Sequence, residues 1–420
     1  MNHNDGDDRL KILLVSLWGS PPYINAQSFR IARIAKYLRK EGNEVTVFGR
    51  RLRAGTLTDS KMVSEMNKYG KVPNILVGNA SRLSTPATSK ILNLGGAPDN
   101  LIFSIPNYFH KLKKIINDTS IDCVLTSNTP SSYLIGALVK RDIRIPWIAD
   151  FCDLWTGNPG FYYPTILHRY LQERIELKTL SQADGISYSS ESWEPLLRKR
   201  YPRMKLCYTP NGFDSEEFIS DSEAKQVRSG LTFSSIGTIY GDTDLVFLKA
   251  FIDFINDTPK ANESVKMKIM GSVDHDIKQE IERLCKSYRN IEVKGLLTSE
   301  NTIREIMESD FLVYDLGTGN TAKYDHMPGR LPLYIGSGKP TIACCLPGGV
   351  SDTLFRKFGC WRIVESGKQI NVKGCYREAW DIYSSGAKLK NLKTWNIESK
   401  SLQWDRIVRD LDIFIKEVCR

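Results

Sequence analysis

Short apolar runs alternate with segments of helical periodicity along most of the chain. This alternation is typical of parallel sheets in which each strand is followed by a returning helix. The clearest helix is predicted over Ser28–Lys40. Its apolar residues share one helical face: Ile31, Ile34, Ala35 and Leu38. A first series of strands is predicted at Lys11–Leu17, Glu44–Phe48, Ile75–Val77, Cys123–Ser127, Trp147–Phe151, Gly185–Ser189 and Leu206–Thr209.

A second series of strands begins after a polar, turn-rich segment. The turn Pro210–Asp214 and the polar run Ser215–Ser229 separate the two series, so we place the domain boundary there, between 1–212 and 213–397. Two series of similar design predict an α/β protein with two Rossmann-like lobes facing each other across a cleft. The second series covers Leu231–Gly237, Val265–Gly271, Ile291–Gly295, Phe311–Asp315, Pro340–Cys345 and Trp361–Val364.

Composition narrows the classes of partner. The 420 residues are 41% hydrophobic, enough for large cores in two domains. A formal charge of +10 favours acidic partners, namely nucleotide diphosphates, anionic lipid surfaces or nucleic acid. The basic clusters Arg198–Lys205 and Lys111–Lys114 have a solvated helix face as their alternative interpretation. The nine cysteines show no C-x-x-C and no apolar run is long enough to span a bilayer, which predicts a cytoplasmic protein, soluble or peripheral to a membrane.

The segment Met327–Ala343 carries the strongest chemical signal. It reads as a Pro-Gly turn, a short helix, a Gly-x-Gly break and a strand. A turn that enters a helix directs backbone N–H groups towards one point, and Arg330 adds a positive charge there. An anion suits such a point, so a nucleotide-sugar site between two lobes is the leading hypothesis. His326 is adjacent to this turn.

Four predicted strands end in small or polar residues. Ligands of open parallel sheets bind at the carboxyl ends of strands, and glycine lets the backbone approach a ligand closely. After the turn Gly237–Gly241, Asp242 or Asp244 is expected to cap the next helix. The four ends are Trp18–Pro22 with Gly19 and Ser20, Gly237–Gly241 with Thr238 and Tyr240, Gly271–Ser272, and Gly295–Leu297 with Leu296.

Two carboxylates follow another strand. Asp150 and Asp153 lie three residues apart, with Trp155 beside them. Carboxylates there could orient sugar hydroxyls, accept a proton from an acceptor or stabilise a cationic sugar centre. The structural alternative is that Asp153 caps a turn and Asp150 bonds loop amides. The polar stretch Arg51–Asn100 has two interpretations, acceptor contacts or disorder.

Several enzyme classes lack their motifs in this chain. G-x-x-x-x-G-K-S/T, H-E-x-x-H and G-x-S-x-G are absent, which argues against a P-loop nucleotidase, a zincin and a serine hydrolase. The histidines are scattered without the spacing of metal ligands. We therefore predict no metal site.

The order of four motifs resembles the two-lobed GT-B glycosyltransferases, specifically family 4. The resemblance implies metal-independent, retaining transfer of a sugar from a nucleotide-sugar to a glycan or lipid-linked acceptor, without a cofactor, in cell-surface polysaccharide synthesis. It implies an acceptor-side lobe over 1–212 and a donor-binding lobe over 213–397, with a helix in 398–420 crossing back to the first lobe. The motifs are IADFCDLWTGNP, ERIELKTLSQADGISYSS, TPNGFD and GRLPLYIGSGKP.

The resemblance also implies residue roles. Asp150 and Asp153 become the catalytic candidates. The implied donor contacts are Gly19, Ser20, Gly237, Thr238, Tyr240, Gly271, Gly295, Leu296, Asp325, Gly329, Arg330 and Leu331. Nucleic acid is not expected as a partner, whereas an anionic membrane surface is.

Three positions depart from the family pattern. Thr238 and Thr243 stand where an arginine and a lysine are common, and Leu333 replaces the second of two paired glutamates, the first being Asp325. Arg30 or Arg33 of the first lobe could restore positive charge. These departures support a second hypothesis, a GT-B-shaped partner or regulatory protein with weakened catalysis. A GT-B epimerase or phosphorylase fits the motif order less well.

Overall fold

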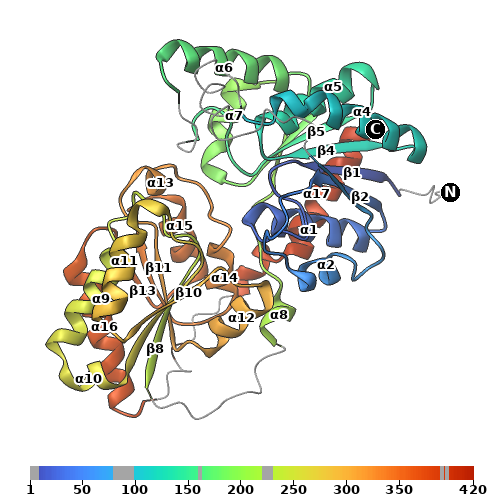
Figure 1. The fold of residues 1–420 in the computed structure, drawn as a ribbon. Coiled ribbons are helices and arrows are strands. Elements are labelled where there is room, and N and C mark those ends of the chain that lie inside the picture. Colours follow the sequence, from blue (N-terminus) through green and yellow to red (C-terminus); the bar gives the residue numbers. More distant parts are fainter. Residues whose placement is uncertain (1–8, 79–98, 159–162, 220–229, 388–391, 393–396) are drawn as a thin grey trace. The chain divides into compact units, whose positions relative to one another are not determined.

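The structure is a computed structural model that describes residues 9–78, 99–158, 163–219, 230–387, 392 and 397–420. The chain divides into two compact units (Figure 1). Unit 1 comprises Met1–Pro210 and Trp404–Arg420, and unit 2 comprises Asn211–Gln403. Each unit is built on one parallel sheet, so the predicted α/β class with two Rossmann-like halves is confirmed.

Unit 1 contains a seven-stranded parallel sheet in the order β3-β2-β1-β4-β5-β6-β7. Its central strands are buried on both faces, which explains why they appear in the sequence as nearly continuous apolar runs. The strands are β1 (Lys11–Ser16), β2 (Glu44–Arg50), β3 (Asn74–Val77), β4 (Cys123–Ser127), β5 (Trp147–Phe151), β6 (Gly185–Tyr188) and β7 (Lys205–Tyr208).

Helices cover both faces of the unit 1 sheet. Ile12 and Leu14 of β1 face one apolar cluster, which includes side chains of the C-terminal helix, whereas Leu13 and Val15 face another. The C-terminal helix belongs to unit 1, where Asn43 donates a hydrogen bond of 2.6 Å to Asp412. The helices are α1 (Ala26–Lys40), α2 (Ser60–Met66), α4 (Ile105–Thr119), α5 (Pro130–Asp142), α6 (Ile166–Leu180), α7 (Glu194–Arg200) and α17 (Trp404–Cys419), with 3₁₀ turns η1 (Ile102–Ser104) and η2 (Glu191–Trp193).

Unit 2 contains a six-stranded parallel sheet in the order β10-β9-β8-β11-β12-β13. Helices again supply apolar side chains to two clusters, one on each face of the sheet. The strands are β8 (Leu231–Ile236), β9 (Val265–Met270), β10 (Ile291–Gly295), β11 (Phe311–Asp315), β12 (Thr341–Cys345) and β13 (Arg362–Glu365). The helical elements are α8 (Ser215–Ile219), α9 (Val246–Asp257), α10 (Pro259–Ser264), α11 (His275–Ser287), α12 (Ser299–Glu308), α13 (Asn320–Lys323), α14 (Leu331–Gly336), α15 (Val350–Phe358), α16 (Gln369–Ser384) and the 3₁₀ segment η4 (Ile397–Leu402).

The structure corrects two local expectations. The stretch Arg51–Asn100 is not irregular throughout, because α2 lies within it, capped by Asp59, which accepts a 3.0 Å bond from the Met62 N–H. Its part at 79–98 lies outside the described residues. Neither expected acid is the N-cap of α9: that position is Leu245, although Asp244 accepts a 3.3 Å bond from the Val246 N–H.

Two further observations bear on the class of protein. Among the described residues, none of the helices is both long and apolar enough to cross a membrane. All nine cysteines are free thiols, and four of them are buried: Cys123, Cys344, Cys345 and Cys375.

Candidate functional site

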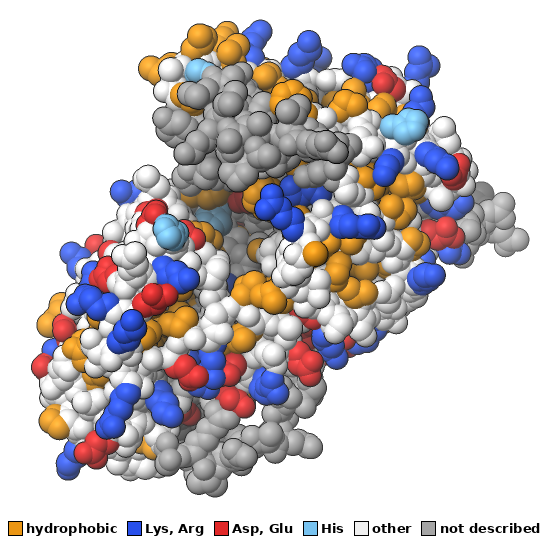
Figure 2. All heavy atoms as spheres, in the orientation of Figure 1, with side chains coloured by type: hydrophobic (Ala, Val, Ile, Leu, Met, Phe, Trp, Pro, Cys, Tyr) orange, Lys and Arg blue, Asp and Glu red, His pale blue; other side chains and the backbone are white. Residues whose placement is uncertain are grey.

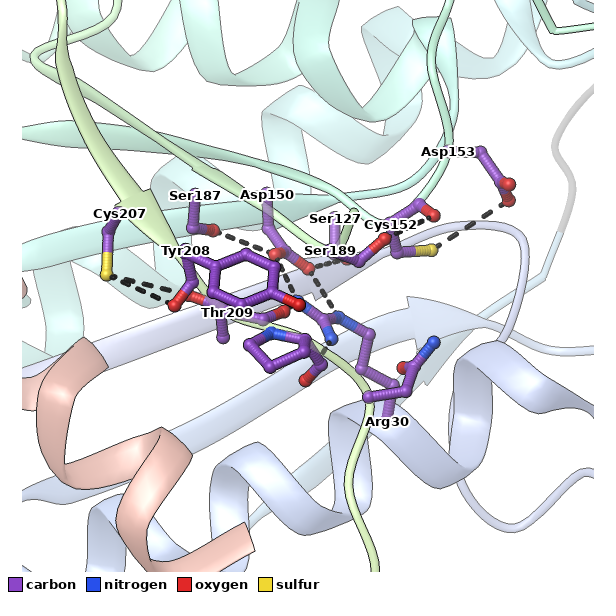
Figure 3. A network of polar contacts seen from close by, with 12 residues as sticks. Arg30, Ser127, Asp150, Cys152, Asp153, Ser187, Ser189, Cys207, Tyr208 and Thr209 are labelled. Atoms are coloured by element: carbon purple, nitrogen blue, oxygen red, sulfur yellow. Dashed lines mark hydrogen bonds and ion pairs between the residues drawn. The ribbon is translucent and has the colours of Figure 1, made fainter. Parts of the chain in front are cut away.

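A buried carboxylate joins the central strands of unit 1. Asp150 of β5 lies in register with Ser127 of β4 and Ser187 of β6. Both hydroxyls donate to its carboxylate, at 2.5 and 2.8 Å. Arg30 of α1 donates to the same carboxylate from Nε and Nη2, at 3.0 and 2.7 Å (Figure 3). Arg30 also donates to the backbone carbonyl of Thr209, which follows β7.

The Arg30–Asp150 pair is sealed from solvent and ionised. Burial alone would raise the pKa of Asp150, but the charge of Arg30 and the hydrogen bonds outweigh it and hold that pKa below its usual range. Four donors match the four lone-pair sites of a carboxylate, so no acceptor capacity is left for a ligand. These partners are side chains and not the expected loop amides. Its surroundings favour a positioning role for Asp150.

Asp153 is in a different setting, on the loop after β5. Figure 3 shows its carboxylate at the outer end of the network, pointing away from Asp150. Asn128 donates a long hydrogen bond of 3.4 Å to it, and the Cys152 thiol lies 3.9 Å away. Burial raises the pKa of Asp153 to about 7. A carboxyl group that titrates near neutrality suits proton transfer. Trp155, by contrast, is a core residue, exposed by 1%.

Three glycines end neighbouring strands of unit 2. Gly237 follows β8, Gly271 follows β9 and Gly295 ends β10. Their φ angles are positive, at 105°, 133° and 70°. A Cβ atom on Gly271 would stand 2.3 Å from the Gly237 carbonyl oxygen, so the close approach of these two loops requires glycine. Beside them, the hydroxyls of Thr238 and Ser272 share an exposed hydrogen bond of 2.9 Å. We call these five residues the glycine shelf.

Arg330 ties the strand ends of unit 2 together. Its guanidinium donates to the carbonyl oxygens of Ile236 and Thr238, both at 3.0 Å, and of Asp315, at 2.9 Å. Its side chain also packs against Gly237, because a Cβ atom on that residue would stand 2.3 Å from the Arg330 Cδ. Three of the five guanidinium N–H donors therefore bind the protein's own backbone, and the expected contact of Arg330 with an anion stays a prediction.

The turn before α14 also uses its own backbone donors. The Leu331 N–H donates to the Pro328 carbonyl and the Leu333 N–H to that of Arg330, both at 3.0 Å. The Leu333 side chain packs against the apolar cluster that includes α14. Gly329 is exposed at this turn.

The Asp325 side chain lies at the N-terminus of α15. Its Oδ1 accepts a 2.7 Å bond from the Val350 N–H, which uses one of the donors that a helix N-terminus offers. Next to it is a small pocket of about 20 Å³, room for about one water, lined in part by Asp325, His326 and Ser366. Burial lowers the pKa of His326 to about 4, so this imidazole is neutral at pH 7.

The remaining predicted donor residues are dispersed. Gly19 and Ser20 form a tight turn after β1: Ser20 donates to the Ser16 carbonyl at 2.8 Å, and Ser16 donates to the Gly19 carbonyl at 2.6 Å. Tyr240 packs against the apolar cluster of unit 2. Leu296 is 44% exposed beside Gly295.

Sequence reasoning missed two charged groups at strand ends. Asp315 ends β11, and its Oδ1 accepts from the Gly317 N–H at 2.7 Å. Among the described residues its buried Oδ2 has no hydrogen-bond partner, and burial raises the pKa of Asp315 to about 7. Arg50 ends β2. Both could have been noticed in the sequence, because each is a charged residue at or just after the end of a predicted apolar strand. Arg33 faces inward, 3.9 Å from Glu65, so neither it nor Arg30 supplies the suggested compensating charge to a ligand.

In the part of the chain that the structure describes, no group of three His, Cys, Asp or Glu residues could hold a metal ion. The residue arrangement thus offers hydroxyls, glycine backbone and two carboxyl groups that titrate near pH 7.

Comparisons with known proteins assign the fold and a domain. Sucrose-phosphate synthase from Thermosynechococcus elongatus matches with a TM-score of 0.67 and 14% identity, covering 97% of this chain and 99% of that one. An α,α-trehalose-phosphate synthase (UDP-forming) from Burkholderia xenovorans gives 0.61 and 10%, covering 97% and 99%. A UDP-N-acetylglucosamine 2-epimerase gives 0.58 and 15%, covering 97% and 96%. No curated protein matches the sequence.

These structural matches share the GT-B fold with this chain, and at such identities they show the fold alone. Residues 26–212 match the family described as "Glycosyl transferase 4-like domain". That range holds α1, the Arg30–Asp150 pair and Asp153. Residues 26–212 are therefore similar to a glycosyl transferase 4-like domain, and the chain as a whole has a GT-B fold.

Proposed function

We propose that this protein transfers a sugar, with retention of configuration and without a metal, from a nucleotide-sugar to a glycan or lipid-linked acceptor in cell-surface polysaccharide synthesis. The observation that carries the proposal is the glycine shelf in unit 2 of a chain whose unit 1 holds a glycosyl transferase 4-like domain. Unit 2 would bind the donor and unit 1 the acceptor.

The shelf supports donor binding through small groups. Glycines at adjacent strand ends leave the backbone accessible to a flat base or a diphosphate, and the hydroxyls of Thr238 and Ser272 can donate to phosphate oxygens. Arg330 acts by holding the loops after β8 and β11, and its positive charge remains nearby. Binding through hydroxyls and amides makes donor affinity modest and less dependent on salt than binding through several cations.

Asp153 is the group that we assign to the chemistry. Its ionised form would orient or deprotonate an acceptor hydroxyl, or stabilise positive charge on the departing sugar. Asp150 would act indirectly, by fixing the strand from which the Asp153 loop begins.

Nucleotide binding tests the donor site most simply. The melting temperature of the full chain is measured with UDP, GDP and ADP, for the wild type and for Ser272→Asp, which puts a negative charge on the exposed shelf. One nucleotide is expected to stabilise the wild type and to lose at least about tenfold in affinity with the variant, because the carboxylate repels phosphate. Ser287→Asp, an exposed serine at the end of α11, is the matched control and is expected to bind normally.

The second candidate is a partner or regulatory protein with weakened catalysis. One observation in its favour is that the Arg330 guanidinium donates to three backbone carbonyls. Another is that Leu333, which stands where the family pattern has a glutamate, packs against an apolar cluster. Nucleotide binding without sugar transfer would support this candidate over the enzyme.

A membrane surface is the second proposed partner. Figure 2 shows apolar side chains gathered over α6 with basic side chains beside them. An exposed apolar face flanked by Arg and Lys suits the interface of an anionic bilayer. Sedimentation with anionic vesicles is expected to retain the wild type and to lose Leu167→Ser/Leu171→Ser. The exposed apolar residues of α6 are Ile166 (89%), Leu167 (63%), Tyr170 (54%), Leu171 (46%) and Leu177 (37%); the basic ones on α6 are Arg169, Arg174 and Lys178.

A further inference from the structure

Arg50 is a half-buried cation that forms no ion pair with any described residue. It ends β2, at the carboxyl edge of the unit 1 sheet. Among the described residues its side chain has neither an ion pair nor a hydrogen bond, and its Nε is fully buried without an acceptor. Burial lowers the pKa of Arg50, although the guanidinium stays charged at neutral pH. A desolvated charge without compensation destabilises the fold.

The neighbouring groups do not neutralise Arg50. Asp99 is an acid whose charge acts on Arg50, yet three of its four acceptor sites are taken by other donors: Ser131 donates from its backbone N–H and its hydroxyl, and Leu101 donates from its N–H at 2.8 Å. Burial raises the pKa of Asp99, against the hydrogen bonds from Ser131 and Leu101 and the charge of Arg50, which lower it. The Tyr108 phenol, whose pKa is raised to about 12, is neutral. Among the described residues Arg50 therefore has the attraction of Asp99 but no direct ion pair or hydrogen bond that would hold its guanidinium.

The guanidinium of Arg50 lies against an exposed tryptophan. Trp18 follows β1, is 52% exposed, and has its ring centre 5.9 Å from the guanidinium carbon. The two strand ends are held close, since a Cβ on Gly49 would stand only 1.8 Å from the Ser20 hydroxyl. An indole face can pack against the C–H face of a sugar ring, while a guanidinium binds phosphate or carboxylate through paired N–H donors.

We propose that Arg50 and Trp18 form a subsite for an anionic sugar, in which the guanidinium binds a phosphate or carboxylate group and the indole packs against the ring. The subsite lies on the carboxyl edge of the unit 1 sheet, the same edge from which the Asp153 loop leaves β5. The proposed subsite depends on the proposed glycosyl transfer only for the identification of this ligand as the acceptor. Binding itself needs neither donor nor catalysis.

Calorimetric titration without nucleotide tests the subsite. The probes are glucose 6-phosphate, glucuronate, glucose and inorganic phosphate, titrated into the full chain. The anionic sugars are expected to bind at least about tenfold more tightly than glucose, because a charge-assisted contact has that magnitude. Arg50→Met is expected to abolish this preference, Arg50→Lys to restore part of it, and Trp18→Ala to weaken every sugar but not inorganic phosphate. Arg53→Ala, an exposed arginine three residues later, is the matched control and should change nothing.

A stability measurement separates this role from a structural one. If Arg50 served the fold, Arg50→Met would lower the midpoint of urea unfolding. The subsite requires a midpoint equal to or above that of the wild type, because the variant removes an uncompensated charge. A clear loss of stability, or unchanged binding of anionic sugars by Arg50→Met, would overturn the proposal.

The anion could belong to a free sugar or to a lipid headgroup. Vesicles containing phosphatidylinositol phosphate form the second arm: retention that Arg50→Met abolishes, with no affinity for glucose 6-phosphate, assigns the anion to a lipid. If no nucleotide binds the protein but sugar binding still depends on Arg50, only the proposed glycosyl transfer is contradicted. The reverse result would contradict only the subsite.

Discussion

Two arginines of unit 1 occupy contrasting environments. Arg30 is 2% exposed, and its charge is matched by Asp150 at 2.7 Å and by backbone carbonyls. Arg50 is half-buried and lies against the ring of Trp18, and among the described residues its side chain has no ion pair and no hydrogen bond. The donors of Arg30 are directed into the protein, where they hold the strands of unit 1 together. We assign the donors of Arg50 to an anionic ligand. Whether hydrogen bonding is complete thus separates charges that build the unit from charges available to a ligand.

The same distinction applies to carboxylates. Asp150 accepts four hydrogen bonds and its pKa lies below the usual range, whereas Asp153 and Asp315 have few partners and pKa values of about 7. Arg330 of unit 2 belongs with Arg30, because three carbonyls hold its guanidinium. Four substitutions test this division.

Breaking the saturated pair should have the largest effect. Asp150→Asn leaves Arg30 buried without a counter-charge, so the free energy of unfolding should fall by about 3–5 kcal/mol. Urea unfolding measures it, and Arg30→Met/Asp150→Leu should recover much of the loss because no charge then remains buried. A cost no greater than that of an exposed control, Asp381→Asn, would show that the pair does not hold the unit together.

Asp315 should make stability depend on pH. Its pKa of about 7 exceeds the ordinary value of 3.8, so its contribution to stability is complete below about pH 4 and is lost as pH rises through about 7. Asp315→Asn removes the charged form and should be more stable than the wild type by about 2–4 kcal/mol at pH 8, but not at pH 4. Equal differences at both pH values would contradict the raised pKa.

Asp153 is expected to affect rate and not folding. Asp153→Asn should lower the transfer rate on the order of a hundredfold, with nucleotide affinity within about twofold, because a carboxylate near the reacting groups acts only on the chemistry. Because the ionised form is the active one, the wild-type rate should rise as pH increases through about 7. The same pH dependence in a slow Asp153→Asn variant would assign the titration to another group.

The smallest effect is expected at Arg330. Arg330→Ala frees the carbonyls that fix the loops after β8 and β11, so donor affinity should weaken by about tenfold. Arg289→Ala, an exposed arginine of the same unit, should leave affinity unchanged. Unaltered nucleotide binding by Arg330→Ala would separate the shelf from the donor site.

The sequence predicted the sheets better than the polar contacts. Buried parallel strands are continuous apolar runs, which is why Cys123–Ser127, Trp147–Phe151 and Phe311–Asp315 agree with the structure to the residue. Helix α2 was missed because it is short and polar, with Met62 and Met66 as its only buried residues.

Partners distant in sequence leave no local pattern. Arg30 and Asp150 are 120 residues apart, and Arg330 lies 94 residues from Ile236. The sequence could place Asp150, Asp153 and Arg330 at strand or helix ends. It could not show that Asp150 accepts four side-chain hydrogen bonds or that Arg330 donates to three carbonyls. For the same reason the unpartnered side chain of Arg50 could be recognised only once the fold had placed its neighbours.

Mass spectrometry of acceptors incubated with a panel of nucleotide-sugars tests the central claim most directly. We expect one donor to add a single glycosyl residue to an acceptor, with an equal amount of nucleotide released and both products lost in Asp153→Asn. Nucleotide binding without a glycosylated product from any donor and acceptor pair would contradict the enzyme and favour a partner protein.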